Sequence, residues 1–213
     1  PQLEVFFHPE TLAKIIALKE YLLKRERSGE IDQVDQWIRM VAMNRLTGHS
    51  PGFFSVYSLP PNQAVSIATQ TKINRKRKQT PERKDIVPRI IRRSKSLLKN
   101  WSGPQLESQS NDLNPLLTVG PANNALKIKP NSAQLVVTSP PFLDVVDYQT
   151  DNWMRCWFLG IDSSTIKISS HKNADEWQDF IAEVFVDLYR IVRPGGYVAF
   201  EVGEVKNGKL LLE

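Results

Sequence analysis

The sequence predicts an α/β fold in which a large helical region, residues 1–110, precedes alternating strands and a helix in residues 111–213. Two observations lead to this prediction. Apolar side chains recur at helical spacing through about the first hundred residues, and beyond the polar, turn-forming segment 102–115 they gather into short β-branched runs. With 213 residues, of which 41% are hydrophobic, the chain is long enough to form one or two packed units.

The N-terminal part is predicted to begin with two helices. The first ends at Gly29, a residue typical of a helix C-terminus, and its apolar residues at helical spacing are Leu12, Ile15, Ile16, Leu22 and Leu23. The second runs from Asp32 to near Gly48, with Val34, Trp37, Ile38 and Val41 on one face. Residues 49–63 are rich in Pro, Gly, Ser and aromatic residues and are predicted to form an ordered loop.

The net charge of the chain is concentrated in one segment. The whole chain has a formal charge of +5, but the segment from Lys72 to Lys99 has twelve basic and only two acidic residues. Such an imbalance favours contact with a polyanion over a solvated helix face. The residues expected to bind nucleic acid are Arg75, Lys76, Arg77, Lys78, Arg89, Arg92 and Arg93. An apolar stripe (Ile86, Ile90, Ile91, Leu97 and Leu98), with Pro88 tolerated in the first turn, predicts that the segment forms a docked helix.

The C-terminal part has the pattern of strand, helix, tight turn and strand. Strands buried on both faces are predicted at 116–120 and 134–138. An amphipathic helix is predicted to begin at Asn173, which with Glu176 resembles a capping box, and to end at the turn 193–196. Its apolar face consists of Trp177, Phe180, Ile181, Val184, Phe185 and Leu188. A further buried strand is predicted at 197–202.

Several classes of protein are disfavoured by composition. The single cysteine, Cys156, cannot form an internal disulfide, and His8, His49 and His171 have no metal-ligand spacing, so we expect no metal. No apolar run approaches the length of a membrane span, and the N-terminus lacks the pattern of a signal peptide. We therefore expect a protein of a reducing compartment, the cytoplasm, without a membrane partner.

The most informative motif is Ser139-Pro140-Pro141-Phe142, which directly follows the predicted strand 134–138. In open α/β sheets, ligands bind at the carboxyl ends of the strands. Two prolines hold the backbone extended and cannot donate an N–H, which leaves a hydroxyl, a carbonyl and an aromatic face in fixed relation. This arrangement suits the binding of a planar base that carries an exocyclic amine.

On these residues the chain resembles the DNA amino-methyltransferases, which methylate N4 of cytosine or N6 of adenine with S-adenosylmethionine. Ser139 to Phe142 match the family's (Ser/Asp/Asn)-Pro-Pro-(Tyr/Phe) motif. Residues 119–122 resemble its Gly-Asp-Ala strand end, with Pro121 where Asp is usual. Residues 190–200 are similar to a segment of class I methyltransferases in general. The resemblance covers about the last hundred residues and implies an incomplete class I, Rossmann-like sheet.

The resemblance implies catalytic roles for Ser139, Pro140, Pro141 and Phe142, and cofactor contacts for Gly120, Ala122 and Thr138. Ser139 and the Pro140 carbonyl would accept the hydrogens of the amine, and Phe142 would stack on a base flipped out of double-stranded DNA. The methyl group would pass directly from the sulfonium of S-adenosylmethionine, so that catalysis is mostly positioning. Serine at the first position favours N4 of cytosine. Methylation at C5 is disfavoured because Pro141 occupies the place of the nucleophilic cysteine.

Further residues are candidates for contacts with the substrate or the cofactor, and each of them has an alternative role in the structure alone. Asp144, Asp147, Tyr148 and Asp151 are expected either to line the substrate pocket or to form a polar loop. Glu201 and Glu204 are expected to face the cofactor or solvent, and His49, Asn62 and Gln63 to reach bases or to remain structural. Trp153 and Trp157, one helical turn apart, are expected in the core.

The sequence departs from the family in one important respect. The Phe-x-Gly-x-Gly cofactor loop does not occur in these 213 residues, and the chain begins at Pro1. We therefore expect a fragment of an enzyme from a restriction–modification or related system, with the loop before Pro1 or, in a permuted order, after Glu213. Two alternatives stay open: a non-catalytic DNA-binding remnant and an RNA methyltransferase.

Overall fold

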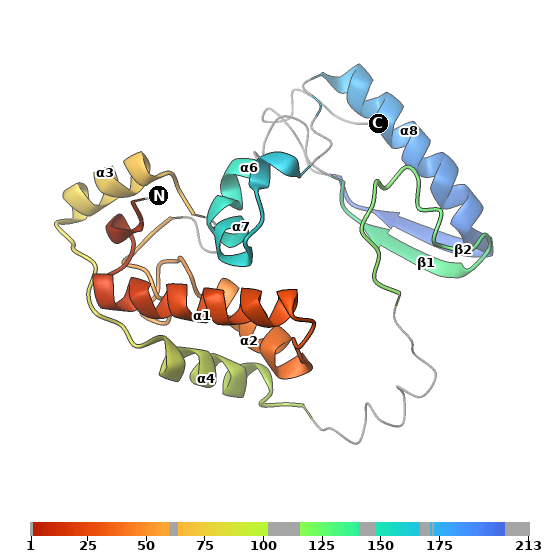
Figure 1. Ribbon diagram of the computed structural model, residues 1–213. Helices are drawn as coiled ribbons and strands as arrows, with labels where there is room; N and C mark the ends of the chain where they lie inside the picture. Colours follow the sequence, from red (N-terminus) through yellow and green to blue (C-terminus); the bar gives the residue numbers. More distant parts are fainter. Residues whose placement is uncertain are drawn as a thin grey trace. The chain divides into compact units, whose positions relative to one another are not determined.

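The computed structural model describes residues 2–59, 64–101, 116–140, 148–166, 171 and 173–202 (Figure 1). The fold is mixed α/β, and the chain divides into two compact units. Unit 1 contains Pro1–Gly103 and Tyr148–Lys167, and unit 2 contains Pro104–Asp147 and Ile168–Glu213. This division differs from the single boundary near residue 110 expected from the sequence, because 148–167 pack with the N-terminal helices.

Unit 1 is helical. Its longer helices are α1 (Pro9–Arg27), α2 (Gln33–Met43), α3 (Ile67–Arg77), α4 (Ile86–Leu97) and α7 (Trp153–Leu159). The short helical turns are η1 (Leu3–Val5), α6 (Tyr148–Asp151) and η2 (Ser163–Thr165). Helices α1 and α4 contact each other, as do α2 and α4, and α7 packs on α1 (Figure 1). Among the described residues, no helix has both the length and the apolar character needed to cross a membrane.

The first two predicted helices are confirmed, and their ends follow local rules. Gly29 adopts a left-handed φ of 72° just beyond α1, a conformation that glycine takes without steric cost. At the start of α2, Asp32 and Asp35 form a reciprocal capping box with each other's backbone N–H groups. Helix α2 ends at Met43, before the predicted Gly48, because the chain turns there into the loop that begins at Asn44.

The core of unit 1 joins residues from all parts of the helical region. The buried members are Leu3, Phe6, Phe7, Leu12, Ile15, Leu22, Val41, Ala42, Leu46, Phe54, Ala64, Ile86, Ile90, Met154 and Phe158. Trp153 and Trp157 pack against this cluster and are partly buried, as expected. The indole N–H of Trp153 donates to the carbonyl of Ala64 (2.9 Å), which satisfies the polar group of this core residue.

The basic segment forms two helices, α3 and α4, rather than one. Helix α4 begins after Asp85, whose carboxylate accepts the N–H of Val87 (3.3 Å), and Pro88 lies in the first turn as predicted. Ile86 and Ile90 are buried against unit 1, so the prediction of a docked helix is confirmed. Ile91, Leu97 and Leu98 stay exposed and do not belong to this buried stripe.

Unit 2 contains a parallel β–α–β arrangement. Strands β1 (Ala133–Thr138) and β2 (Val192–Phe200) pair in parallel, and helix α8 (Ala174–Ile191) leads directly into β2. Helix α8 lies along one face of the strand pair (Figure 1), where Trp177 and Ile181 form a small core with Phe200. The predicted N-terminal cap of α8 is confirmed, because the side chain of Asn173 accepts the N–H of Glu176 (2.8 Å).

The predicted strand at 116–120 is wrong. This segment has no strand structure, and Leu117 and Val119 are 90% and 98% exposed. A strand requires a neighbouring ladder to satisfy its backbone groups, and no described strand lies beside this segment. The prediction that the strands are buried on both faces is also wrong for β1, since Leu135 and Val137 are exposed on the face opposite α8.

The predicted turn at 193–196 appears as an irregularity within β2. Val192 pairs with Ala133 and Tyr197 with Leu135, so residues 193–196 lie opposite Gln134 alone. The side chain of Gln134 accepts a hydrogen bond from the guanidinium of Arg193 and donates one to the carbonyl of Gly195 (3.1 Å), both within this segment. The strand then continues to Phe200, so that Glu201 and Val202 lie outside it.

Replacing Gly196 with alanine is expected to destabilise unit 2 by about 1–3 kcal/mol. A Cβ atom there would lie 2.6 Å from Cγ1 of Val192 and 2.9 Å from the backbone oxygen of Gln134, which cannot move without disturbing the ladder. Gly120→Ala is the control, because its Cβ would meet nothing within 4 Å. The free energy of unfolding of both variants is measured by chemical denaturation. Equal values would show that the structure accommodates a Cβ atom at Gly196 without cost.

Candidate functional site

The carboxyl end of β1 carries the first half of the Ser-Pro-Pro-Phe motif. Thr138 is the last residue of β1, and its carbonyl accepts the N–H of Glu201 (2.9 Å), the first residue after β2. Ser139 and Pro140 therefore leave the sheet beside Glu201, at the edge where both parallel strands end. The side chain of Ser139 is exposed and Pro140 is partly buried. This edge is where open α/β sheets bind ligands.

The strand end offers acceptors to a ligand. Pro140 has no N–H, so its only backbone polar group is its carbonyl, and Ser139 adds a side-chain hydroxyl that can also accept a hydrogen bond. Glu201 is exposed, which fits both of the roles expected for it. Pro141, Phe142, Asp144, Asp147 and Glu204 lie outside the described residues, as does the side chain of Tyr148. Asp151 belongs to α6 of unit 1 and not to unit 2.

Gly120 and Ala122 are not placed at a strand end. They lie in a bend and a turn, in a segment whose next residues are bound to α8: Asn123 donates to Glu183 (2.6 Å), and the N–H of Ala125 donates to Asp187 (2.8 Å). Of the three residues expected to contact S-adenosylmethionine, only Thr138 ends a strand. Among the described residues, Gly120 and Ala122 therefore do not join Thr138 at a strand end.

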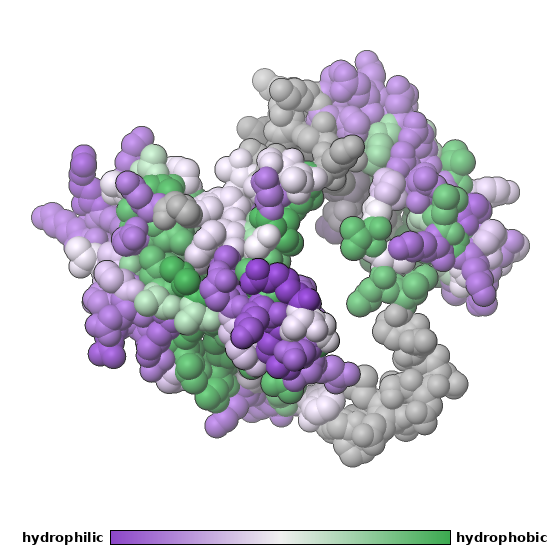
Figure 2. Space-filling model, viewed as in Figure 1, coloured by the Kyte–Doolittle hydropathy of each residue, from purple (hydrophilic) through white to green (hydrophobic). Residues whose placement is uncertain are grey.

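A basic surface covers part of unit 1. Arg75, Lys76 and Arg77 form the last turn of α3, and Lys78 follows in a left-handed conformation with a φ of 50°. All four are exposed, and the surface over α3 is mostly hydrophilic in Figure 2. The guanidinium of Arg77 stacks on the ring of Tyr57, 3.8 Å from its centroid, which orders this side chain.

Helix α4 contributes the remaining predicted cations. Arg92 is exposed, whereas Arg89 and Arg93 are partly buried. Arg89 donates to the carbonyl of Pro51 (3.3 Å) and to that of Asp85 (2.9 Å). Helix α4 is thereby connected to the loop that follows α2, which sequence spacing does not reveal.

Two further cations in this region were missed as site residues. Lys84 donates from Nζ to the carbonyls of Phe53 (3.3 Å) and Ser55, and its backbone is bonded to the hydroxyl of Thr11. Burial, and secondarily the charge of Arg89, lowers the pKa of Lys84. Arg45 lies over the ring of Phe53 (4.2 Å), outside the basic run in the sequence. In the sequence, the feature that could have indicated Arg45 is its position at the end of a predicted helix, shortly before an aromatic loop.

The loop residue His49 is exposed, with its ring 6.4 Å from that of Phe53. It is therefore accessible, as a base contact requires, whereas Asn62 and Gln63 lie outside the described residues. The rest of the loop is largely buried, and Phe53 to Val56 lie in the interior of unit 1. The prediction of an ordered loop is confirmed for the described residues 49–59.

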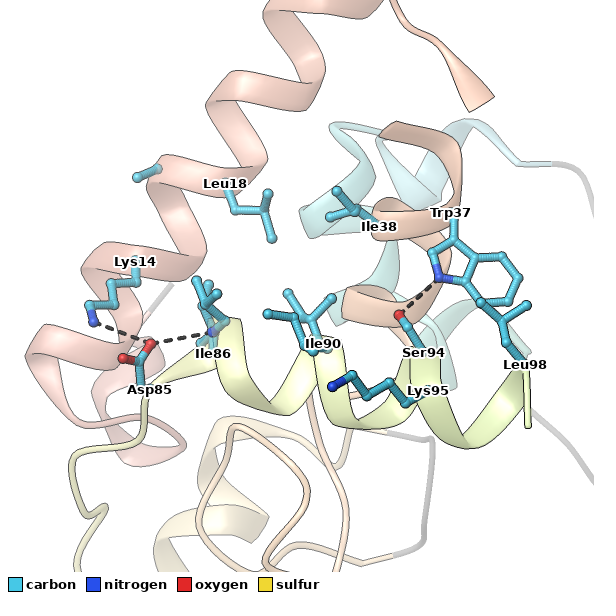
Figure 3. Close-up of a pocket in the computed structure, with 13 residues that line it drawn as sticks. Lys14, Leu18, Trp37, Ile38, Asp85, Ile86, Ile90, Ser94, Lys95 and Leu98 are labelled. Carbon is cyan, nitrogen blue, oxygen red and sulfur yellow. Dashed lines mark hydrogen bonds and ion pairs between the residues drawn. The ribbon is translucent and has the colours of Figure 1, made fainter. Parts of the chain in front are cut away.

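An apolar groove of about 1150 Å³ runs between α1, α2 and α4 (Figure 3). Leu18, Ile38 and Ile90 point into it. At one end the indole N–H of Trp37 donates to the hydroxyl of Ser94 (2.9 Å), and at the other Lys14 pairs with Asp85 (3.3 Å). Helix α4 therefore has one face buried in the core of unit 1, one face that carries basic side chains and one face that lines the groove.

Comparison with known proteins adds no assignment. No protein-family model, curated protein or solved structure matches this chain. Among the described residues, no group of three or more His, Cys, Asp or Glu side chains is placed to hold a metal ion. The functional argument consequently depends on the strand end of unit 2 and the basic surface of unit 1, each considered by itself.

Proposed function

We propose that the protein is a site-specific DNA methyltransferase that transfers a methyl group from S-adenosylmethionine to an exocyclic amine, N4 of cytosine in preference to N6 of adenine. The observation that carries the proposal is the position of Ser139 and Pro140 directly after a parallel strand, β1, beside the end of its neighbour β2. A Rossmann-like sheet, of which β1, α8 and β2 would be one unit, is part of the same proposal.

The strand end would act by positioning the amine. The lone pair of an exocyclic amine is delocalised into the ring, which makes the nitrogen a weak nucleophile. The Ser139 hydroxyl and the Pro140 carbonyl accept its two hydrogens and hold the nitrogen in the geometry in which its lone pair is available. Phe142 stacks on the base after it has left the duplex. None of these roles requires a titrating side chain or a covalent enzyme intermediate.

The basic surface of unit 1 supports DNA as the substrate. Arg75, Lys76, Arg77, Lys78 and Arg92 are exposed on or directly after two successive helices, and Arg89 and Arg93 are partly buried on α4. Such a surface neutralises backbone phosphates and orients a duplex without reading its sequence. We accordingly expect binding to weaken steeply with salt, and charge reversal of Arg92 and Arg93 to flatten that dependence.

The proposal is tested by methyl incorporation. The full-length protein, labelled S-adenosylmethionine and matched duplex DNA and RNA of one sequence are incubated in parallel. Incorporation into DNA but not RNA is expected, and incorporation into RNA alone would favour the RNA methyltransferase instead.

A non-catalytic DNA-binding module is the second candidate. The positions of Gly120 and Ala122 favour it, since neither lies at a strand end where a cofactor would bind. Calorimetry with S-adenosylmethionine separates the two candidates. Binding of the cofactor to this chain would contradict the non-catalytic function, and DNA binding without any cofactor binding or methylation by the full-length protein would support it.

A further inference from the structure

The loop after α2 contains a tight turn at Ser50–Phe53. Pro51 and Gly52 occupy its central positions, and the N–H of Phe53 donates to the carbonyl of Ser50 (3.1 Å). The next residues are fixed by the N–H of Phe54, which donates to Arg45 (2.8 Å), and by that of Ser55, which donates to Leu46 (3.1 Å). The turn is therefore held on an ordered, largely buried segment.

Cationic side chains from three parts of unit 1 converge on this turn. Arg45 covers the ring of Phe53, Arg89 of α4 donates to the Pro51 carbonyl, and Lys84 donates to the Phe53 carbonyl. Burial lowers the pKa of Arg45, and the positive charge of Arg93 lowers it further. Like charges in one place are unfavourable unless an anion compensates them.

Within the described part of the chain no carboxylate forms an ion pair with these cations, although the negative charge of Glu82 partly offsets that of Lys84. The ion pairs found there include none formed by Arg45, Lys84, Arg89 or Arg93. The neighbouring Arg83, by contrast, pairs with Glu10 (2.8 Å), and Lys14 pairs with Asp85. Positive charge is thus concentrated at the turn, and Arg45 has no ion-pair partner among the described residues.

Gly52, a central residue of the turn, lies next to the side chains of Arg45 and Ser50. Its φ is not in the left-handed region, so the backbone does not require glycine. A Cβ atom at this position would lie 3.8 Å from Nη1 of Arg45 and 3.8 Å from Oγ of Ser50, in ordinary contact with both. The space that a side chain would occupy at Gly52 is therefore bordered by both the Arg45 guanidinium and the Ser50 hydroxyl.

We propose that Arg45, Ser50 and Gly52 form a binding site for one phosphate group of the backbone of duplex DNA. A guanidinium offers paired donors to phosphate oxygens, a serine hydroxyl donates a third hydrogen bond, and a bare glycine permits close approach. The site rests on the proposed DNA-binding function. It adds one specific phosphate contact to that function, separate from the exposed cations of α3.

The site is tested with the variants Arg45→Gln and Gly52→Ala in the full-length protein. Arg27→Gln, which removes the same charge from the end of α1, is the control. DNA affinity is measured by fluorescence anisotropy over a range of salt concentrations. Loss of one phosphate contact is expected to reduce the salt slope by about 0.9 and the affinity at 0.1 M salt by about 8-fold, in both variants but not in the control.

Phosphate itself provides the second readout. Titration with inorganic phosphate is expected to shift the NMR signals of Arg45 Nε and of the amides of Ser50–Phe53, and Gly52→Ala to abolish these shifts. DNA binding that is equal in wild type, Arg45→Gln and Gly52→Ala would overturn the site while leaving the proposed function intact. Phosphate-induced shifts without any DNA affinity would retain the phosphate site but contradict DNA as its source, and with it the proposed function.

Discussion

Replacing Ser139 with alanine is expected to lower the rate of methyl transfer to duplex DNA by about 10- to 100-fold, because it removes an acceptor for the amine. A hydrogen bond to a group that becomes charged contributes about 1.5–3 kcal/mol, and each 1.4 kcal/mol corresponds to a factor of ten in rate. The rate is measured under single-turnover conditions with the full-length protein. DNA affinity is expected to stay the same, since Ser139 is not part of the basic surface.

Two controls make this prediction specific. Ser132→Ala removes a serine hydroxyl just before the opposite end of β1, where it donates to the carbonyl of Lys129 (2.6 Å), and should leave the rate unchanged. Ser139→Asn restores an acceptor at the same position and should recover part of the activity. Equal rates for Ser139→Ala and wild type would contradict the role proposed for the residues at the end of β1.

Phe142→Ala extends the same prediction to the stacking partner. Stacking of a base on an aromatic ring contributes about 1–3 kcal/mol, so a loss of about 5- to 150-fold in methylation of duplex DNA is expected. Unchanged methylation by this variant would contradict the assignment of the motif.

Replacing Asp187 with alanine is expected to lower the free energy of unfolding of unit 2 by about 3 kcal/mol. Asp187 is 8% exposed and accepts hydrogen bonds from Nε of Arg190 (2.7 Å) and from the N–H of Ala125 (2.8 Å). Arg190 in turn donates to the carbonyls of Ile128 and Ala125. Removing the carboxylate leaves a partly buried guanidinium without its counter-charge and releases the segment before β1 from α8.

Hydrogen exchange of the β1 amides measures this effect, because exchange reports the local opening of unit 2. Asp179→Ala, which removes an exposed carboxylate from the same helix, is the control and should change protection little. Unaltered exchange in Asp187→Ala would show that the stability of β1 does not depend on this ion pair.

The pKa of Asp187 also determines how the stability of unit 2 is expected to change in acid. The hydrogen bond from Arg190, followed by that from Ala125, holds the pKa of Asp187 below its usual value. A carboxylate whose pKa is lower in the folded state stabilises the fold above its unfolded pKa, about 3.9. This stabilisation is lost as the pH falls below about 4, and Asp187→Ala should reduce the acid sensitivity of unit 2.

Local signals made much of the fold predictable. The caps at Asp32 and Asn173 act within one helical turn, so their sequence positions indicated the starts of α2 and α8. The turn before Tyr197 was predictable in the same way, because Pro and Gly restrict the backbone locally. The parallel pairing of β1 and β2 agrees with the predicted order of strand, helix and strand.

The errors arose where structure depends on distant neighbours. An apolar run such as 116–120 becomes a strand only beside another strand, and its composition cannot show whether that neighbour is present. Arg45 was missed because it is separated in sequence from the basic run and meets Lys84 and Arg89 at the turn Ser50–Phe53 only through tertiary packing. The strand-end position of Ser139 and Pro140 was predictable, since strand and motif are contiguous in the sequence.

The central claim, that the protein methylates an exocyclic amine of DNA, is tested most directly by the identity of the product. Duplex DNA treated with the full-length protein and S-adenosylmethionine is digested to nucleosides and analysed by mass spectrometry. N4-methylcytosine is the expected product, with N6-methyladenine as the other outcome compatible with amine methylation. The appearance of 5-methylcytosine, or of no methylated nucleoside at all, would contradict the claim.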